Sequence, residues 1–253
     1  MAARQQRVNP AGIAVTTSHD TDTLLPATAI ILAGGQGARM GGADKALLRW
    51  GEGTMLEHAV EQAALVAREV LVVGGHAREV APAALRQAQD RPRGRVGRPE
   101  RSRGAARVPD LFEGCGPLGG LHAGLTAATF ERCVALGCDM PFASPLVLRA
   151  LVEMSEGYDA AVPRAADGLH PLLAVYSRRC LPAIADRLEK GRRRLISFLD
   201  QVRVRWVTEA ELRPLDPDLR CLFNINTWQD YRRALALAGS GREIARSHAA
   251  RCD

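Results

Sequence analysis

The sequence lacks any apolar run long enough to cross a membrane, since no window reaches the roughly eighteen residues that a spanning helix needs. The stretch 1–23 carries Arg4 and Arg7 but no apolar core ahead of a cleavage site, so we expect no secretory signal there. The six cysteines form no C-x-x-C pair, which argues against a structural zinc site. A chain of 253 residues needs no disulfide staples, so we expect reduced, mostly buried thiols and a cytoplasmic protein.

Positive charge is concentrated in one short segment. The net charge is +6, from 34 Lys and Arg against 28 Asp and Glu. From Arg86 to Arg107 there are eight arginines but only Asp90 and Glu100 as acidic residues, so this segment holds the whole excess. Residues 87–107 are almost without apolar side chains, and we expect an inserted, solvated loop. They also lack the interleaved aromatics of a nucleic-acid-binding arm, so we expect neither nucleic acid nor a membrane as a partner.

Short apolar runs alternate with segments of helical periodicity. Ala29–Ala33, Val70–Val73 and Cys133–Leu136 are typical of strands buried on both faces. Between the first two, Thr54 and Glu57 form a capping-box pattern, and apolar residues repeat at helical spacing up to Ala67. This β-loop-α-β order predicts a parallel sheet with a right-handed crossover.

The rest of the chain continues the same pattern. We expect helices at 116–126, at 145–153 behind the Ser144-Pro145 cap, at 181–188 up to Gly191, at 195–199, and from the Thr227/Asp230 cap to about Ala238; strands are expected at 159–162, 169–176 and 202–207. The fold class is therefore a single three-layer α/β/α domain with a mostly parallel, Rossmann-like sheet over residues 28–238. We expect a disordered leader at 1–27 and a flexible tail at 239–253.

The strongest functional signal is the loop after the first strand, Leu32-Ala33-Gly34-Gly35-Gln36-Gly37-Ala38-Arg39-Met40-Gly41-Gly42-Ala43-Asp44-Lys45. Its glycines let backbone N–H groups turn inward as an anion-binding nest, and Arg39 and Lys45 add positive charge, which suits a polyphosphate. A plain flexible surface loop is the alternative. A P-loop is excluded because no Lys stands between Gly and Ser or Thr, and a G-x-G-x-x-G fingerprint fails at Met40.

Asp139 is the second signal, because it lies just beyond the strand 133–136. Ligands of open parallel sheets bind outside the carboxyl ends of the strands, so Asp139 and the glycine loop should share one crevice. A carboxylate that faces a triphosphate is suited to hold Mg²⁺, although an Asp before Met140-Pro141 also suits a simple turn. Asp110, at the end of a third strand-like segment, is a weaker candidate for the same cleft.

Four motifs in order resemble molybdenum cofactor guanylyltransferases of the MobA type. They are the loop 32–45, Asp110 with Gly116-Pro117-Leu118-x-Gly120, Cys138-Asp139-Met140-Pro141, and Asn224-Ile225-Asn226-Thr227. The loop alone indicates only the wider nucleotidyltransferase superfamily, whereas the set is more specific. The resemblance implies that the terminal phosphate of molybdopterin attacks the α-phosphate of GTP, which forms a guanine dinucleotide and releases pyrophosphate.

The resemblance also implies roles for individual residues. Nucleotide contacts fall on Leu32, Ala33, Gly34, Gly35, Lys45, Asp110 and Asp139. Asp139 would hold Mg²⁺, and Lys45, Asp139 and Arg39 would serve the reaction by positioning and charge neutralisation. Asn224–Asn226 would lie near the molybdopterin end, and His170-Pro171 and Gly191-Arg192-Arg193 in the second half of the site.

Some positions depart from the family pattern, and other activities stay open. His76 stands where an Asn is usual, Trp228 replaces a Pro, and the Arg-rich insertion precedes Asp110. The alternatives are a cytidylyltransferase for the same pterin, a sugar-phosphate nucleotidyltransferase, and a non-catalytic nucleotide-binding relative. The Leu-Ala-Gly-Gly form favours guanine. GTP and molybdopterin are the expected partners of a monomer, with transient contact to molybdoenzyme maturation proteins.

Overall fold

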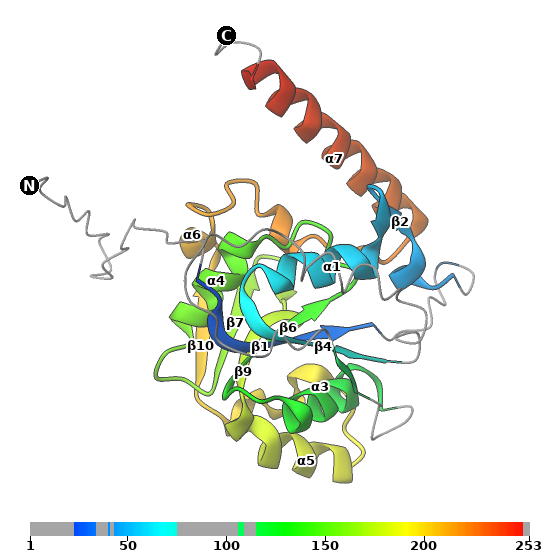
Figure 1. Cartoon of the computed structure of the whole chain (residues 1–253). Coiled ribbons are helices and arrows are strands. Elements are labelled where there is room, and N and C mark those ends of the chain that lie inside the picture. Colours follow the sequence, from blue (N-terminus) through cyan, green and yellow to red (C-terminus); the bar gives the residue numbers. More distant parts are fainter. Residues whose placement is uncertain (1–22, 34–39, 41–42, 75–105, 109–114, 250–253) are drawn as a thin grey trace, which may run out of the picture.

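The fold is built on a central β-sheet (Figure 1). The computed structural model describes residues 23–33, 40, 43–74, 106–108 and 115–249. The strands of the sheet are β1 (Leu25–Leu32), β4 (Ala67–Val73), β5 (Ala106–Val108), β6 (Arg132–Gly137), β7 (Ala160–Ala165), β8 (Gly168–Leu169), β9 (Leu173–Ser177) and β10 (Val204–Thr208). They lie in the order β10-β7-β9-β6-β1-β4-β5, with β8 paired to β7. A separate hairpin joins β2 (Arg49–Trp50) to β3 (Gly53–Thr54).

Most neighbouring strands are parallel, which confirms the predicted fold class. β1 pairs in parallel with β4 and β6, β4 with β5, and β7 with β10. Only β9 among the longer strands runs against both of its neighbours, β6 and β7. The carboxyl ends of β1, β4 and β6 therefore meet at one edge of the sheet, and that edge positions the site.

Helices cover both faces of the sheet and complete three layers (Figure 1). They are α1 (Met55–Ala64), α3 (Gly116–Ala127), α4 (Pro145–Met154), α5 (Leu181–Glu189), α6 (Glu209–Leu212) and α7 (Trp228–Ala249), with 3₁₀ turns η2 (Lys45–Leu47), η3 (Arg178–Cys180), η4 (Leu195–Gln201) and η5 (Arg220–Leu222). Ile31 packs on the α1 and α4 side, while Ile30 and Leu32 pack on the α3 and α5 side. α3 can pack close to the sheet because Gly124 has no side chain: a Cβ there would lie only 2.5 Å from Ile30 Cγ2.

Three boundaries differ from the sequence-based predictions. The apolar stretch 169–176 is not one strand, because Pro171 cannot donate a ladder hydrogen bond and the chain breaks into β8 and β9 there. Ala106 and Arg107, assigned to the inserted loop, belong to β5 and pair with β4. Ala67, assigned to the preceding helix, instead begins β4.

The last helix is longer than predicted. α7 extends to Ala249, well past its predicted end near Ala238, while the flexibility of 239–253 stays a prediction. A glycine inside a helix costs only about 1 kcal/mol relative to alanine, and the neighbouring Ala, Arg and Glu residues favour helix. Figure 1 shows α7 extending away from the sheet. Within the described part of the chain, no helix is both long and apolar enough to traverse a bilayer.

The structure confirms the prediction of free, mostly buried thiols for the cysteines that it describes. Cys133, Cys138, Cys180 and Cys221 are buried free thiols, and Cys115 is half-buried. Burial raises the pKa of the Cys133 and Cys180 thiols to about 12. These thiols are therefore protonated at neutral pH and serve as small apolar side chains of the core.

Candidate active site

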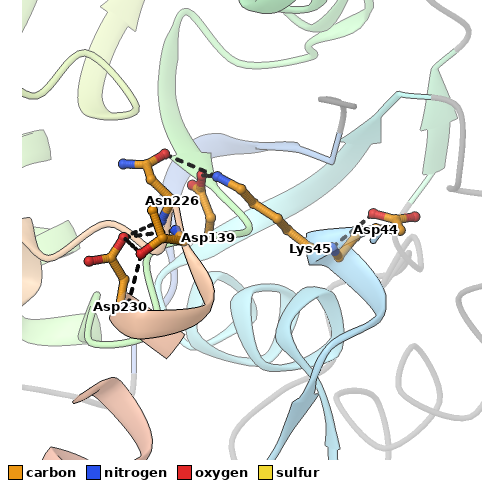
Figure 2. A network of polar contacts seen from close by, with 7 residues as sticks. Asp44, Lys45, Asp139, Asn226 and Asp230 are labelled. Carbon is orange, nitrogen blue, oxygen red and sulfur yellow. Dashed lines mark hydrogen bonds and ion pairs between the residues drawn. The ribbon is translucent and has the colours of Figure 1, made fainter. Parts of the chain in front are cut away.

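Lys45 and Asp139 meet beyond the carboxyl edge of the central strands. Lys45 begins η2, where the Asp44 carboxylate caps the turn by accepting a 2.9 Å hydrogen bond from the Ala46 N–H. Asp139 lies in the turn that follows β6. The Lys45 Nζ lies 3.2 Å from Asp139 Oδ2, and the two side chains are only 19% and 15% exposed (Figure 2). The structure thus brings together the two residues that the sequence placed in one crevice.

The Asp139 carboxylate is held close to the backbone at the end of β6. A Cβ on Gly137 would lie 2.6 Å from Asp139 Oδ1, so any side chain at position 137 would displace this carboxylate. Burial raises the pKa of Asp139, while the charge and the hydrogen bond of Lys45 lower it. Burial disfavours the charged carboxylate, and the Lys45 ammonium offsets part of that cost.

Segments from both ends of the domain clamp the turn that carries Asp139. The backbone N–H of Ile225 donates to the Asp139 carbonyl at 2.9 Å. On the other side, Nε2 of His58 in α1 lies 2.9 Å from the Pro141 carbonyl and must be the donor, since a carbonyl only accepts. Phe142 lies between Trp50 and Phe223, with edge-on ring centroids at 5.5 and 5.9 Å.

Asn226 adds a second oxygen to the surroundings of Lys45. Lys45 Nζ donates a 3.0 Å hydrogen bond to Asn226 Oδ1, so its ammonium lies between a carboxylate and an amide oxygen (Figure 2). Asp230 in turn accepts from the Asn226 backbone N–H at 3.0 Å. The sequence suggested only a helix cap and a position near the pterin for this segment. The Lys45 contact was missed because it joins residues 181 positions apart.

Comparisons with known proteins show the family of this chain. The sequence profile described as a MobA-like NTP transferase domain matches residues 29–204. A protein of Pelotomaculum thermopropionicum named "probable molybdenum cofactor guanylyltransferase" is 40% identical over 219 residues, which cover 87% of this chain and 97% of that protein. The chain belongs to the MobA-like NTP transferase family.

Further relatives of this MobA-like domain extend the match beyond the profile. The molybdenum cofactor guanylyltransferase of Desulfosudis oleivorans is 34% identical over 216 residues, 85% of this chain and 97% of that protein. The crystal structure of molybdopterin-guanine dinucleotide biosynthesis protein A from Archaeoglobus fulgidus is 27% identical with a TM-score of 0.66, and covers 84% of this chain and 99% of that chain. The Thermus thermophilus 2-C-methyl-D-erythritol 4-phosphate cytidylyltransferase, 20% identical with a TM-score of 0.53 over 83% of this chain and 98% of that chain, shares the fold.

The remaining predicted nucleotide contacts are only partly within the described residues. Leu32 ends β1 and Ala33 follows it, and both side chains are buried, so the nucleotide contacts predicted for them would have to be made by the backbone. Within the sheet edge, the Cys138 N–H donates to the Leu32 carbonyl at 3.3 Å, and the Ala33 N–H donates to Val73 at 2.9 Å. Four other predicted residues lie outside the described part of the chain, namely Gly34, Gly35, Arg39 and Asp110, as does His76.

Residues predicted for the second half of the site lie on neighbouring elements. His170 follows β8, and its Nε2 lies 2.9 Å from Asp167 Oδ1. Arg192 is exposed after α5, where Gly191 adopts a positive φ of 67°. Topology places both segments at the same edge as Asp139, because β7 and α5 end there. Their contact with an acceptor stays a prediction.

The donor set at Asp139 fits a cation that is shared with a substrate. Among the described residues, no group of three or more His, Cys, Asp or Glu side chains is placed to hold a metal ion. Asp139 and Asn226 instead offer one carboxylate and one amide oxygen on either side of a positive charge. Mg²⁺ is commonly bound by one or two carboxylates together with phosphate oxygens, so these hard donors fit it as part of a nucleotide complex.

Proposed function

We propose that this protein transfers GMP from GTP to the terminal phosphate of molybdopterin, with release of pyrophosphate. The observation that carries the proposal is the Lys45–Asp139 pair at 3.2 Å, beyond the carboxyl ends of β1 and β6. The names of its relatives, molybdenum cofactor guanylyltransferases, support the choice of nucleotide and acceptor.

The chemistry requires positioning and neutralisation of charge more than a covalent partner. A phosphate oxygen of the acceptor forms a bond to the α-phosphorus of GTP as the bond to the bridging oxygen breaks, and pyrophosphate leaves with that electron pair. The attacking phosphate is already an anion, so no side chain has to remove a proton from it. Lys45 contributes a fixed positive charge to the phosphates, as preorganised groups do in phosphoryl-type transfers.

Asp139 would hold Mg²⁺ together with the triphosphate, with Asn226 as a neighbouring oxygen donor. Mg²⁺ bound there would neutralise phosphate charge as a Lewis acid. Lys45 contacts Oδ2 of this carboxylate, so its ammonium and the cation would share Asp139. We also propose that the protein acts as a monomer and passes its product to molybdoenzyme maturation proteins.

A nucleotide panel tests the proposal. The protein is incubated with Mg²⁺, molybdopterin and GTP, ATP, CTP or UTP in turn, and the products are identified by mass spectrometry alongside pyrophosphate release. We expect a guanine dinucleotide and pyrophosphate with GTP, and greater thermal stabilisation by GTP than by ATP or CTP. A cytosine dinucleotide, transfer to a sugar phosphate but not to the pterin, or binding without product would each replace the proposal with one of its alternatives.

A further inference from the structure

The carboxylate that caps α7 is connected to Lys45 through Asn226. Asp230 Oδ2 accepts from the Thr227 N–H at 2.8 Å, from the Thr227 hydroxyl at 2.9 Å and from the Asn226 N–H at 3.0 Å. The Asp230 N–H donates back to the Thr227 hydroxyl at 3.1 Å, which closes a capping box. Figure 2 shows this carboxylate below Asn226, whose amide oxygen points at Lys45.

The Asp230 cap accepts a hydrogen bond from one residue further back in the chain than the capping boxes of α1 and α6 do. In the capping boxes of α1 and α6, Glu57 and Glu211 accept from the N–H and hydroxyl of Thr54 and Thr208. Asp230, with a shorter side chain, accepts those two bonds and also the N–H of the residue before the cap. That extra bond fixes the backbone of Asn226, the residue that contacts Lys45. Helix capping alone does not require it.

Lys45 is a residue at which small displacements matter. Its Nζ lies within 3.2 Å of Asp139 Oδ2 and 3.0 Å of Asn226 Oδ1. Almost all of the basic residues in the sequence are arginines, and the only lysine besides Lys45 is Lys190. A compact ammonium fits between two oxygens where the planar fork of arginine does not. Burial alone raises the pKa of Asp230, but hydrogen bonds from Thr227 and Asn226, with the charge of Lys45, lower it below its usual range. Asp230 therefore carries a charge at neutral pH.

We infer that Asp230 is a positioning residue: through the Asn226 backbone it fixes the amide oxygen that holds the Lys45 ammonium beside Asp139. Asp230 makes no contact with the reacting atoms in this role. Its effect on turnover rests on the proposed function, whereas its effect on the place of Lys45 does not. A displacement of about 1 Å at a reacting group is enough to lower a rate substantially.

The substitution Asp230→Glu separates positioning from capping. Glutamate preserves an ordinary capping box, as Glu57 and Glu211 do, but in those boxes it takes only the bonds of the cap residue. Asp230→Ala removes both functions. Glu211→Asp makes the converse change in a capping box distant from Lys45 and is the matched control.

Two readouts decide the inference. The first is the rate of acylation of Lys45 by acetic anhydride, measured by mass spectrometry relative to Lys190, which forms a 2.6 Å ion pair with Asp186 on α5. The second is pyrophosphate release, resolved into kcat and KM for GTP. We expect Asp230→Glu to keep the wild-type unfolding temperature, to raise the Lys45-to-Lys190 ratio at least about twofold, and to lower kcat about tenfold with little change in KM. Asp230→Ala should show the same changes with a lower unfolding temperature.

Wild-type acylation ratio and kcat in Asp230→Glu would overturn the inference and leave Asp230 as a cap only. A parallel change in Glu211→Asp would overturn it as well, because capping anywhere would then be sufficient. If the wild type transfers no GMP, the proposed function fails, but the acylation ratio still decides whether Asp230 positions Lys45.

Discussion

The backbone N–H of Ile225 donates a hydrogen bond of 2.9 Å to the carbonyl of Asp139, and so joins the end of β6 to the segment before α7. Ile225 is fully buried and packs in a cluster with Met40 and Met55. It lies beyond residue 204, where the MobA-like profile ends. The Asp139 turn is therefore held from the C-terminal segment as well as from the sheet, and changes in either are expected to reach the site.

His58 provides a test of the other side of this clamp. Burial lowers its pKa, against the opposing effects of the Pro141 carbonyl and Glu61. A histidine whose pKa is depressed by folding stabilises the fold above about pH 6.5, and this contribution is lost as pH falls through the folded-state pKa. His58→Gln keeps an N–H donor without the titration, so its stability should fall less between pH 7.5 and 5.5 than that of the wild type.

Urea unfolding at the two pH values measures this difference. His122, whose pKa burial also lowers, contributes equally to both proteins and cancels. His58→Leu, which lacks the donor, should be less stable than His58→Gln by about 1 kcal/mol at pH 7.5, the usual worth of a lost hydrogen bond. Identical pH dependence in the wild type and His58→Gln would show that His58 titrates as in water.

The Arg-rich insertion should be removable up to the start of β5. Residues 87–105 have little apolar surface to contribute to a core, whereas Ala106–Val108 pair in register with Leu71–Val73 and must stay. We expect the deletion to give a folded, active enzyme with a lower isoelectric point, measured by circular dichroism, pyrophosphate release and isoelectric focusing. Failure to recover folded protein would show that the segment supports the fold.

Lys45→Ala should lower pyrophosphate release by about 10²-fold, the usual effect of losing one preorganised electrostatic group. The Mg²⁺ dependence of GTP binding should persist, because Asp139 remains. Lys190→Ala is the matched control, since Lys190 is 57% exposed and pairs with Asp186 on the helix that it caps. Equal turnover in the two variants would remove Lys45 from the reaction.

Local signals in the sequence were sufficient for much of the fold. The Ser144-Pro145 cap, the Thr54/Glu57 box and the buried strand before the glycine loop are each contained in a few neighbouring residues, and all three are confirmed. The reversed direction of β9 was not predictable, because an apolar run specifies burial but not strand direction. The Asp139 position followed from the rule for strand ends.

The contacts of Lys45 illustrate what the sequence leaves open. Its nearness to Asp139 followed from topology, since both follow strands that end at one edge. Its hydrogen bond to Asn226 depends on how the segment 223–227 packs between Phe142 and Met55, and only the assembled core determines that arrangement. Motifs therefore predicted the part of the site formed by Lys45 and Asp139, while packing determined its link to α7 through Asn226.

Pyrophosphate release by Asp139→Asn, compared with Asp159→Asn, is the most direct test of the proposed active site. Asp159 is a carboxylate of similar side-chain exposure, 17% against 15%, but it precedes β7 and so lies at the opposite edge of the sheet. With wild-type far-UV spectra in both, we expect turnover to fall about 10²-fold or more in Asp139→Asn and to stay at the wild-type level in Asp159→Asn. Near-wild-type turnover in Asp139→Asn would contradict the role of this carboxylate and with it the proposed mechanism.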